Sequence, residues 1–305
     1  MNRNKSLDVG MIGVGQMGHP IAACLQRAGH RLSFMLHPGN QPSGDLQSAG
    51  ASAVATAAQV ASLSDFILIC VNGSAQVEQI VLGDAGLLEN LRPGAVVIDC
   101  STSLPDSTRK LAQLIGQHGA HMLDAAMTRT PREAKLGTLN LLIGGEAEVL
   151  ERSLPVLQCF AETLTHAGPI GCGHQMKLIY NFASIGSVVL LAEAAAASRR
   201  AGIDDAVLVD ILGAGGAWGA ALERLRPYLL EADVSALRFS MHNALKDLSY
   251  YCDMLSETGG ACAIAEAVRA TVAQASKAGD PSAALPTIVD LLASFPRDDN
   301  CATRA

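Results

Sequence analysis

Residues 8–20 read Asp8-Val-Gly-Met-Ile-Gly-Val-Gly-Gln-Met-Gly-His-Pro20, and this stretch decides the fold. A short apolar run followed by the pattern Gly-x-Gly-x-x-Gly predicts a strand, a tight turn and the start of a helix. The first glycine permits the turn, the second lets a pyrophosphate approach the backbone, and the third allows close packing of helix on strand. We therefore predict a dinucleotide site, against the alternative of an ordinary glycine turn. Its predicted cofactor contacts are Gly13, Val14, Gly15, Gln16, Met17 and Gly18.

The composition is that of a folded globular protein with room for two domains. The chain has 305 residues, of which 49% are hydrophobic and 17% charged. A net charge of -7 without a basic stripe, together with only 4% aromatic residues, argues against nucleic-acid binding. We expect neither a signal peptide nor a membrane span, because the alanine-rich run 183–197 contains Glu193 and is closed by Arg199 and Arg200. The expected location is the cytoplasm.

The cysteines and histidines give no sign of a disulfide framework or a metal site. No two of the eight cysteines are spaced as C-x-x-C, so we expect free thiols in a reducing compartment. His118 and His121 lie three residues apart, but no third ligand is near them in the sequence. We predict no metal.

Apolar runs alternate with helical patterns through residues 1–167, which is typical of a parallel sheet covered on both faces. From residue 174 onward only helical patterns follow, and the first of them, 175–201, spans about 40 Å at the helical rise. We predict a doubly wound α/β domain of Rossmann type over residues 1–167, an all-α substrate and dimerisation domain over 168–298, and a tail over 299–305. The predicted strands, the last two appended to the doubly wound core, are residues 8–12, 32–36, 66–71, 95–99, 121–125, 139–143 and 163–167.

The end of the second predicted strand bears on the choice of cofactor. It reads Leu36-His37-Pro38-Gly39, where a carboxylate would be needed to hold the ribose 2′-hydroxyl of NAD. No charge there repels a 2′-phosphate, and His37 can donate a hydrogen bond to one. The alternative is a histidine that caps a turn before the proline. The sequence favours NADP and leaves NAD open.

Lys177 and Asn181 lie one helical turn apart, just after a glycine-punctuated stretch. Reduction of a carbonyl by hydride needs a proton donor at the new alkoxide, and a lysine amine can donate that proton or accept it in reverse. Asn181 and Ser184 lie on the same predicted face and are expected to bind the substrate. The alternative is a solvated helix face, which the apolar run that follows disfavours.

Several motifs occur in an order that resembles one known family. They are residues 13–20, Asp99-Cys-Ser-Thr102, Gly137-Thr-Leu139 with Gly144-Gly145, residues 168–181 and Lys246-Asp247. Together they resemble the β-hydroxyacid dehydrogenases, a group that includes 3-hydroxyisobutyrate dehydrogenase, tartronate semialdehyde reductase and sulfolactaldehyde reductase. The resemblance covers nearly the whole chain.

This resemblance implies roles for individual residues. Lys177 is implied to be the general acid/base, and Thr102 to lie beside the nicotinamide. Asn72 and Lys246 are assigned to the cofactor as well, although Lys246 can also reach the substrate. Members act on short three- or four-carbon acids and form dimers or tetramers through the helical domain, so we expect a homodimer or homotetramer. Imine reductases share the fold but replace the lysine, which argues against that activity here.

The segment Thr128-Arg129-Thr130 departs from the Ser-Gly-Gly that most members carry at this place. An arginine presents a planar charged fork suited to a carboxylate, sulfonate or phosphate. Sulfolactaldehyde reductase is similar in having an arginine and a threonine here, and a serine at the position of Ser184. We predict that Arg129, flanked by the two threonines, binds the anionic end of the substrate. Pairing of Arg129 with a surface acid such as Glu133 is the alternative.

Trp218, the only tryptophan, lies in the glycine-rich segment 213–219 between two predicted helices. The resemblance implies that this loop lines the substrate pocket, so Trp218 either shapes the pocket or anchors helix packing. We predict an NAD(P)-dependent oxidoreductase that interconverts a short β-hydroxy acid and its semialdehyde by hydride transfer. The alternatives are a sulfolactaldehyde-type reductase and a non-catalytic dinucleotide-binding relative.

Overall fold

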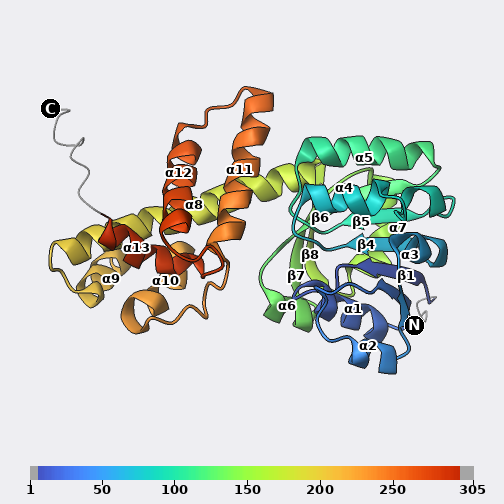
Figure 1. The fold of residues 1–305 in the computed structure, drawn as a ribbon, viewed down its shortest axis with the longest axis horizontal. Helices are drawn as coiled ribbons and strands as arrows, with labels where there is room; N and C mark the ends of the chain where they lie inside the picture. Colours follow the sequence, from blue (N-terminus) through green and yellow to red (C-terminus); the bar gives the residue numbers. More distant parts are fainter. Residues whose placement is uncertain (1–5, 296–305) are drawn as a thin grey trace. The chain divides into compact units, whose positions relative to one another are not determined.

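The computed structural model describes residues 6–295, and its contacts divide the chain into two compact units, Met1–Lys177 and Leu178–Ala305 (Figure 1). The division falls inside helix α8 (Cys172–Arg200), whereas the sequence places a boundary at residue 168, where the last strand ends. The tail predicted at 299–305 lies outside the described residues.

An eight-stranded sheet forms the centre of the first unit, with strand order β3-β2-β1-β4-β5-β6-β7-β8. Strands β1 to β6 are parallel, β7 is antiparallel to β6, and β8 is parallel to β7. The predicted doubly wound sheet with two appended strands is confirmed. The strands are β1 (Asp8–Ile12), β2 (Arg31–Met35), β3 (Ser52–Val54), β4 (Phe66–Ile69), β5 (Val96–Asp99), β6 (His121–Thr128), β7 (Leu139–Gly144) and β8 (Ala161–Gly168).

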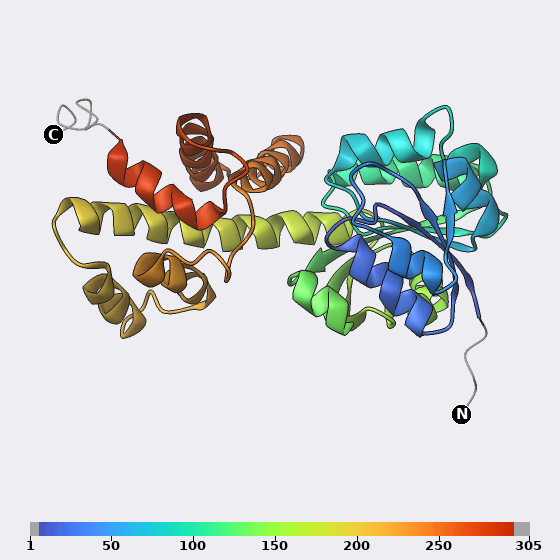
Figure 2. The same cartoon turned by 60° about the horizontal axis from the view of Figure 1, so that its bottom comes forward.

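Helices cover both faces of this sheet, as Figure 2 shows. Successive strand side chains point to opposite faces, so Leu68 packs in one apolar core and its neighbours Ile67 and Ile69 in the other. The first core is covered by α1 (Gly18–Arg27), α2 (Gly44–Ser48), α6 (Pro131–Leu136) and α7 (Ala147–Leu157). The second is covered by α3 (Ala57–Leu63), α4 (Ser74–Leu82), the 3-10 turn η1 (Leu88–Asn90) and α5 (Pro105–Gln117).

The second unit is helical in its described part, apart from one bridge between Ser240 and Ala284. Its core gathers side chains from α8 and from the helices that follow, among them Val188, Leu225 and Leu248. The predicted all-α domain is confirmed. Its further elements are α9 (Asp205–Gly213), α10 (Ala220–Glu231), α11 (Met241–Thr258), α12 (Ala263–Ala278), the 3-10 turn η2 (Leu285–Thr287) and α13 (Ile288–Ser294).

Helix α8 is long and apolar enough to cross a membrane by length and composition alone, and 44% of its most apolar stretch is buried. Ile185, Val188, Val189 and Ala192 of this helix belong to the core of the helical unit. Burial within the helical unit therefore accounts for part of its apolar composition, while Leu190 of the same helix is exposed.

Candidate active site

The turn between β1 and α1 is closed tightly around two of its glycines. Gly13 has φ +90°, and a Cβ there would lie 2.1 Å from the carbonyl oxygen of Cys70 in the loop after β4. A Cβ on Gly18 would lie 1.9 Å from the carbonyl oxygen of Gly13. By contrast, a Cβ on Gly15 would meet nothing within 4 Å. Packing therefore requires Gly13 and Gly18, whereas Gly15 faces open space that a ligand can enter.

The N-terminus of α1 suits an anion. Its first turn contains no acidic residue, and Met17 makes no side-chain cap hydrogen bond. The partial positive charge of the helix end and its unpaired N–H groups thus remain available for a pyrophosphate. The turn also follows β1, which lies beside β4 where the strand order reverses, the usual place for a ligand in such sheets. Gln16 is exposed in this turn and Met17 is half-buried.

Val14 lies behind the turn. Its side chain is fully buried, its N–H donates to Asn40 Oδ1 at 3.1 Å, and its carbonyl accepts from Gln41 N–H at 2.8 Å. Asn40 also donates to the carbonyl of Met35 at 2.9 Å, so it ties the glycine turn to the end of β2. Nothing in the sequence marks Asn40 as a site residue, because Val14 lies 26 positions away.

His37 lies exposed in the segment after β2. Its Nδ1 accepts a hydrogen bond from the N–H of Gly39 at 3.0 Å, which is the turn-capping arrangement considered as an alternative. With Nδ1 as acceptor, the neutral ring carries its proton on Nε2 and can still donate to a phosphate. The next carboxylate in the sequence, Asp45, is paired with His19 Nε2 at 3.0 Å.

Thr102 is half-buried in the loop after β5, between two buried serines. The buried carboxylate of Asp99 holds this loop, since Oδ1 accepts from the N–H of Ser101 at 2.9 Å and Oδ2 from the hydroxyl of Ser103 at 3.0 Å. Asp99 is thus a supporting residue of this loop, and nothing in the sequence spacing marks that role.

Asn72 lies exposed in the loop after β4, where its N–H donates to Gln76 Oε1 at 2.8 Å. The neighbouring Val71 N–H donates to Ser101 Oγ at 3.1 Å, which links the loops after β4 and β5. Because β1, β4 and β5 are adjacent and parallel, the structure brings Asn72, Thr102 and the glycine turn to one edge of the sheet.

The cysteines in the described residues are free, as predicted. Cys70 flanks the glycine turn, and burial raises the pKa of its thiol to about 12. Burial also raises the pKa of the Cys100 thiol well above its ordinary value. Both thiols stay protonated at neutral pH, so neither is suited to act as a nucleophile.

In the segment at the end of β6, both Arg129 and Thr130 are bound to carboxylates of the protein itself. Thr128 is buried, and the backbone of Arg129 has φ 75°, a left-handed conformation that residues other than glycine rarely adopt. Thr130 caps α6, and its N–H donates to the Glu133 carboxylate at 3.1 Å. Arg129 pairs instead with Glu162 at 2.7 Å. The surface-acid alternative therefore occurs with a different partner, and any anion that binds Arg129 would have to compete with Glu162.

Lys177, Asn181 and Ser184 succeed one another along α8 at the predicted spacing. Lys177 is half-buried and Asn181 is 7% exposed, so the solvated-face alternative is wrong for Asn181. The Asn181 amide donates to Asp247 Oδ2 at 2.6 Å, and the Lys246 ammonium pairs with Asp247 Oδ1 at 3.1 Å. One buried carboxylate on α11 thus holds two predicted site residues.

Arg224 of α10 is a half-buried cation that is not among the predicted site residues. Its guanidinium donates to the hydroxyl of Ser184 at 3.3 Å. Among the described residues, no carboxylate oxygen lies within 4.0 Å of it. Nothing in its spacing marks it, since only the packing of α10 places it beside α8.

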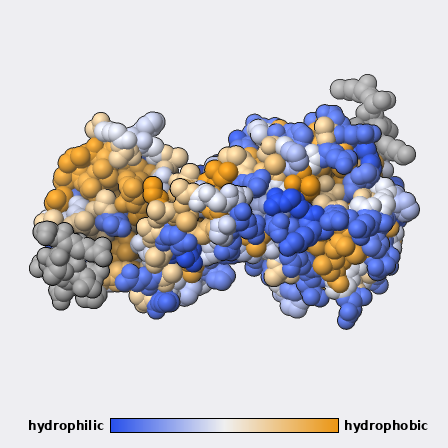
Figure 3. Space-filling view, turned by 90° about the horizontal axis from the view of Figure 1, so that it is seen from above, coloured by the Kyte–Doolittle hydropathy of each residue, from blue (hydrophilic) through white to orange (hydrophobic). Residues whose placement is uncertain are grey.

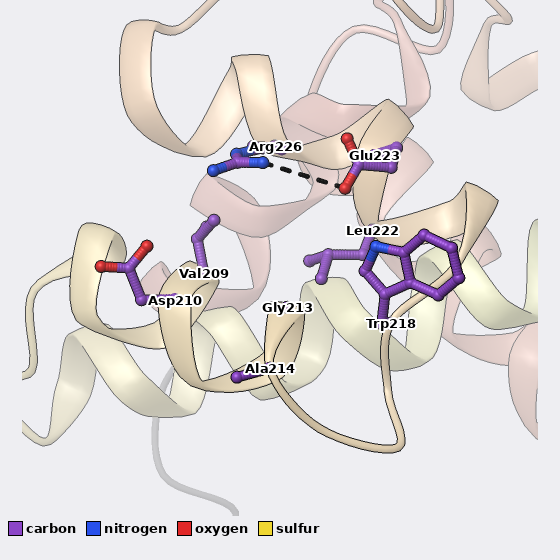
Figure 4. Close-up of a pocket in the computed structure, with 8 residues that line it drawn as sticks. All are labelled: Val209, Asp210, Gly213, Ala214, Trp218, Leu222, Glu223 and Arg226. Carbon is purple, nitrogen blue, oxygen red and sulfur yellow. Dashed lines mark ion pairs between the residues drawn. The ribbon is translucent and has the colours of Figure 1, made fainter.

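Trp218 is 65% exposed, which argues against the alternative of a helix-packing anchor. It lines a pocket of about 290 Å³ between α9 and α10 (Figure 4), together with Val209, Asp210, Gly213, Ala214, Leu222, Glu223 and Arg226. Glu223 and Arg226 form an ion pair at 3.9 Å on one wall. Neither Asn181 nor Ser184 lines this pocket.

A doubly wound sheet with an open glycine turn at the point where its strand order reverses, followed by a helical unit, defines a dinucleotide-binding protein. Residues 8–168 match the family profile described as the NAD binding domain of 6-phosphogluconate dehydrogenase. Residues 171–292 match the one described as NAD-binding of NADP-dependent 3-hydroxyisobutyrate dehydrogenase. The chain belongs to the β-hydroxyacid dehydrogenase family, and it is an NAD(P)-dependent oxidoreductase that acts on the CH–OH group of hydroxy acids.

Individual relatives are similar over most of their length. The chain is 35% identical over 222 residues to NAD-dependent L-serine dehydrogenase of Pseudomonas aeruginosa, covering 72% of this chain and 74% of that one. It is 33% identical over 272 residues to 3-sulfolactaldehyde reductase of Escherichia coli, covering 89% and 91%. The crystal structure of 3-hydroxyisobutyrate dehydrogenase from Salmonella typhimurium superposes with a TM-score of 0.81 at 25% identity, covering 93% of this chain and 99% of that one.

Proposed function

We propose that this enzyme interconverts a short β-hydroxy acid and its semialdehyde, with Lys177 as the general acid/base. The observation that carries the proposal is the half-buried Lys177 one turn before the buried Asn181. When bound, the dinucleotide supplies or accepts the hydride. Lys177 then donates a proton to the carbonyl oxygen during reduction and removes it from the hydroxyl during oxidation.

Asn181 serves to orient the reacting group. Because its amide nitrogen donates to Asp247, its Oδ1 is directed elsewhere and can accept a hydrogen bond from a substrate hydroxyl. The amide assignment is fixed by the carboxylate, which accepts hydrogen bonds and donates none when ionised.

NADP is the proposed preferred cofactor. From residue 36 to residue 44 the segment after β2 contains no carboxylate, and Asp45 is already paired with His19. His37 retains a ring N–H for a 2′-phosphate. The Pseudomonas relative is named as NAD-dependent, so the test must compare both cofactors.

The substrate is proposed to carry an anionic group held by Arg129. Two of the relatives are named for L-serine and 3-sulfolactaldehyde, which carry a carboxylate and a sulfonate respectively. The ion pair with Glu162 occupies one side of the Arg129 fork. Arg224, which has no carboxylate partner among the described residues and contacts Ser184, is a second candidate for the same role.

We also propose that the protein is a cytoplasmic homodimer or homotetramer assembled through its helical unit. Figure 3 shows apolar side chains gathered over this unit on the face drawn. Large apolar side chains exposed in the unit include Leu190, Val207, Ile211 and Ile264. Light scattering of the wild type and of Ile211→Lys will test this, and a wild-type monomer would contradict it.

A turnover panel tests the activity. It pairs NADPH and NADH with tartronate semialdehyde, methylmalonate semialdehyde, succinate semialdehyde and sulfolactaldehyde. Lys177→Ala should lower kcat by about 10²- to 10⁴-fold while dinucleotide binding persists. Lys110→Ala, an exposed lysine on α5, is the matched control and should leave kcat unchanged. Tight dinucleotide binding without turnover of any member would favour the non-catalytic alternative.

A further inference from the structure

The carboxylate of Asp124 lies fully buried at the start of α8, although it belongs to β6. Its Oδ1 accepts a hydrogen bond from the N–H of Gly171 at 2.7 Å, and its Oδ2 accepts one from the N–H of His174 at 2.7 Å. The first N–H groups of a helix have no partner within the helix. Asp124 therefore holds the start of α8 in place, although it lies about 50 positions earlier in the sequence.

Two glycines close around this carboxylate. A Cβ on Gly144 would lie 2.4 Å from Asp124 Oδ1, and a Cβ on Gly173 would lie 2.7 Å from Asp124 Oδ2. The same Cβ on Gly173 would lie 2.8 Å from the backbone nitrogen of Gly144. A side chain at either glycine would displace the carboxylate or the backbone that holds it, so the position of Asp124 is defined from both sides.

His174 connects this anchor to the loop that carries Thr102. Its side chain is fully buried, and its Nδ1 lies 2.7 Å from the hydroxyl of Thr108 on α5. Its Nε2 lies 3.8 Å from Asp99 Oδ2 and has no hydrogen-bond partner among the described residues. Its Nδ1 lies 3.9 Å from Asp124 Oδ2, so the imidazole packs between the carboxylates of Asp99 and Asp124. Asp99 in turn holds the loop of Thr102 through Ser101 and Ser103.

We propose that Asp124 is a positioning residue that sets where the first turn of α8 begins and thereby where the amine of Lys177 lies. Lys177 follows His174 by three residues on the same helix, so a shift of the first turn moves both. A displacement of about 1 Å at a reacting group can lower the rate about 10²-fold. The proposal rests on the proposed role of Lys177 as acid/base, and extends it to the group that holds the lysine.

Asp124→Asn tests this directly, because the amide keeps one acceptor but turns an N–H₂ group toward one of the two backbone donors. We expect kcat to fall by about 10²-fold, while KM and the dinucleotide dissociation constant change less than about threefold. The matched control is Asp204→Asn. Asp204 also accepts a hydrogen bond from an N–H at the start of a helix, that of Ala206 at 2.9 Å, but this helix is α9. The kcat of the Asp204→Asn variant should equal that of the wild type.

A double-mutant cycle separates positioning from general damage. If Asp124 acts through the lysine, Asp124→Asn should cause no further loss in a Lys177→Ala background, with or without added methylamine as a soluble proton donor. An equal loss in both backgrounds, or an unchanged kcat in the single variant, would overturn the proposal. A wild-type kcat in Lys177→Ala would instead overturn the proposed function.

Hydrogen exchange gives a readout that does not depend on turnover. Amides of residues 174–178 should exchange faster in Asp124→Asn than in the wild type, while those of α11 remain unchanged. Should that variant fail to fold, Thr108→Val removes only the hydroxyl beside His174 and should lower kcat severalfold, with the same non-additivity toward Lys177→Ala. Full additivity in this second cycle would contradict the proposal.

Discussion

Asn181 on α8 donates a 2.6 Å hydrogen bond to the buried carboxylate of Asp247 on α11. The same carboxylate pairs with Lys246 at 3.1 Å. A buried charge with two partners is costly to remove, because both of these interactions are then lost. The orientation of Asn181 therefore depends on a residue from a different helix.

Asp247→Asn should disturb the site and the fold together. The neutral amide weakens the hydrogen bond to Asn181 and removes the 3.1 Å ion pair with Lys246, so we expect the free energy of unfolding to fall by about 1–3 kcal/mol. The value of kcat/KM should fall about tenfold. Denaturant melts and steady-state kinetics measure both. Asp253→Asn, an exposed carboxylate on the same helix, is the control and should change neither quantity.

Gly15→Ala and Gly18→Ala should separate ligand binding from folding. A methyl group at Gly15 meets no protein atom within 4 Å, so the melting temperature should hold while dinucleotide affinity falls about tenfold. At Gly18 the methyl group collides with the backbone of Gly13, and the free energy of unfolding should fall by about 1–3 kcal/mol. Equal loss of stability in the two variants would contradict this assignment.

Arg129→Ala and Arg224→Ala identify the residue that holds the substrate anion. Loss of a hydrogen bond between charged groups should raise KM about tenfold or more in the variant that lacks the binding arginine, with little change in kcat. If Arg129 is that residue, Glu162→Gln should lower KM, because the carboxylate no longer competes for the guanidinium. An unchanged KM in Arg129→Ala would exclude it. A raised KM in Arg224→Ala would assign the role to that residue.

His37→Asp should reverse the cofactor preference. A carboxylate at the end of β2 can accept hydrogen bonds from the ribose hydroxyls of NAD and repels a 2′-phosphate. We expect the affinity for NADP to fall about tenfold while that for NAD holds or rises. Titration of both cofactors by fluorescence measures the ratio, and a wild type that already prefers NAD would contradict the NADP assignment.

Asp8→Asn should alter how stability depends on pH. Hydrogen bonds from Arg31, and then from Arg92, hold the pKa of Asp8 below its ordinary value of 3.8. A lowered folded-state pKa contributes stability above the ordinary value, and this is lost as pH falls through the lowered one. At pH 7 the variant should be less stable by about 0.5–1 kcal/mol.

The difference between Asp8→Asn and the wild type should disappear when urea melts are repeated at a pH below the folded-state pKa of Asp8. Asp84→Asn, an exposed carboxylate without an ion pair among the described residues, is the control and should track the wild type at every pH. A difference that persists at low pH would point to a cause other than charge.

The strongly patterned elements of this fold were predictable from sequence, and the short ones were not. The continuous apolar runs of β1 and β4 and the long stretches free of strand signals in the second unit were readable from the sequence, and the corresponding strands and helices are all present. Strand β3 has only three residues, and α2 has only five. Such segments are too brief to show a period, and they form because neighbouring elements supply their partners.

The sequence by itself determined the chemistry: the glycine turn, the lysine one turn before the asparagine, and the order of the two units, because these depend on local spacing. Only the tertiary structure decided which groups hold that chemistry in place. Asp247 beside Asn181, Asp124 at the start of α8, and Glu162 on Arg129 each join residues more than thirty positions apart. Hydrogen bonds and ion pairs depend on distances of about 3 Å, and the fold of the chain, not its local spacing, brings such residues together.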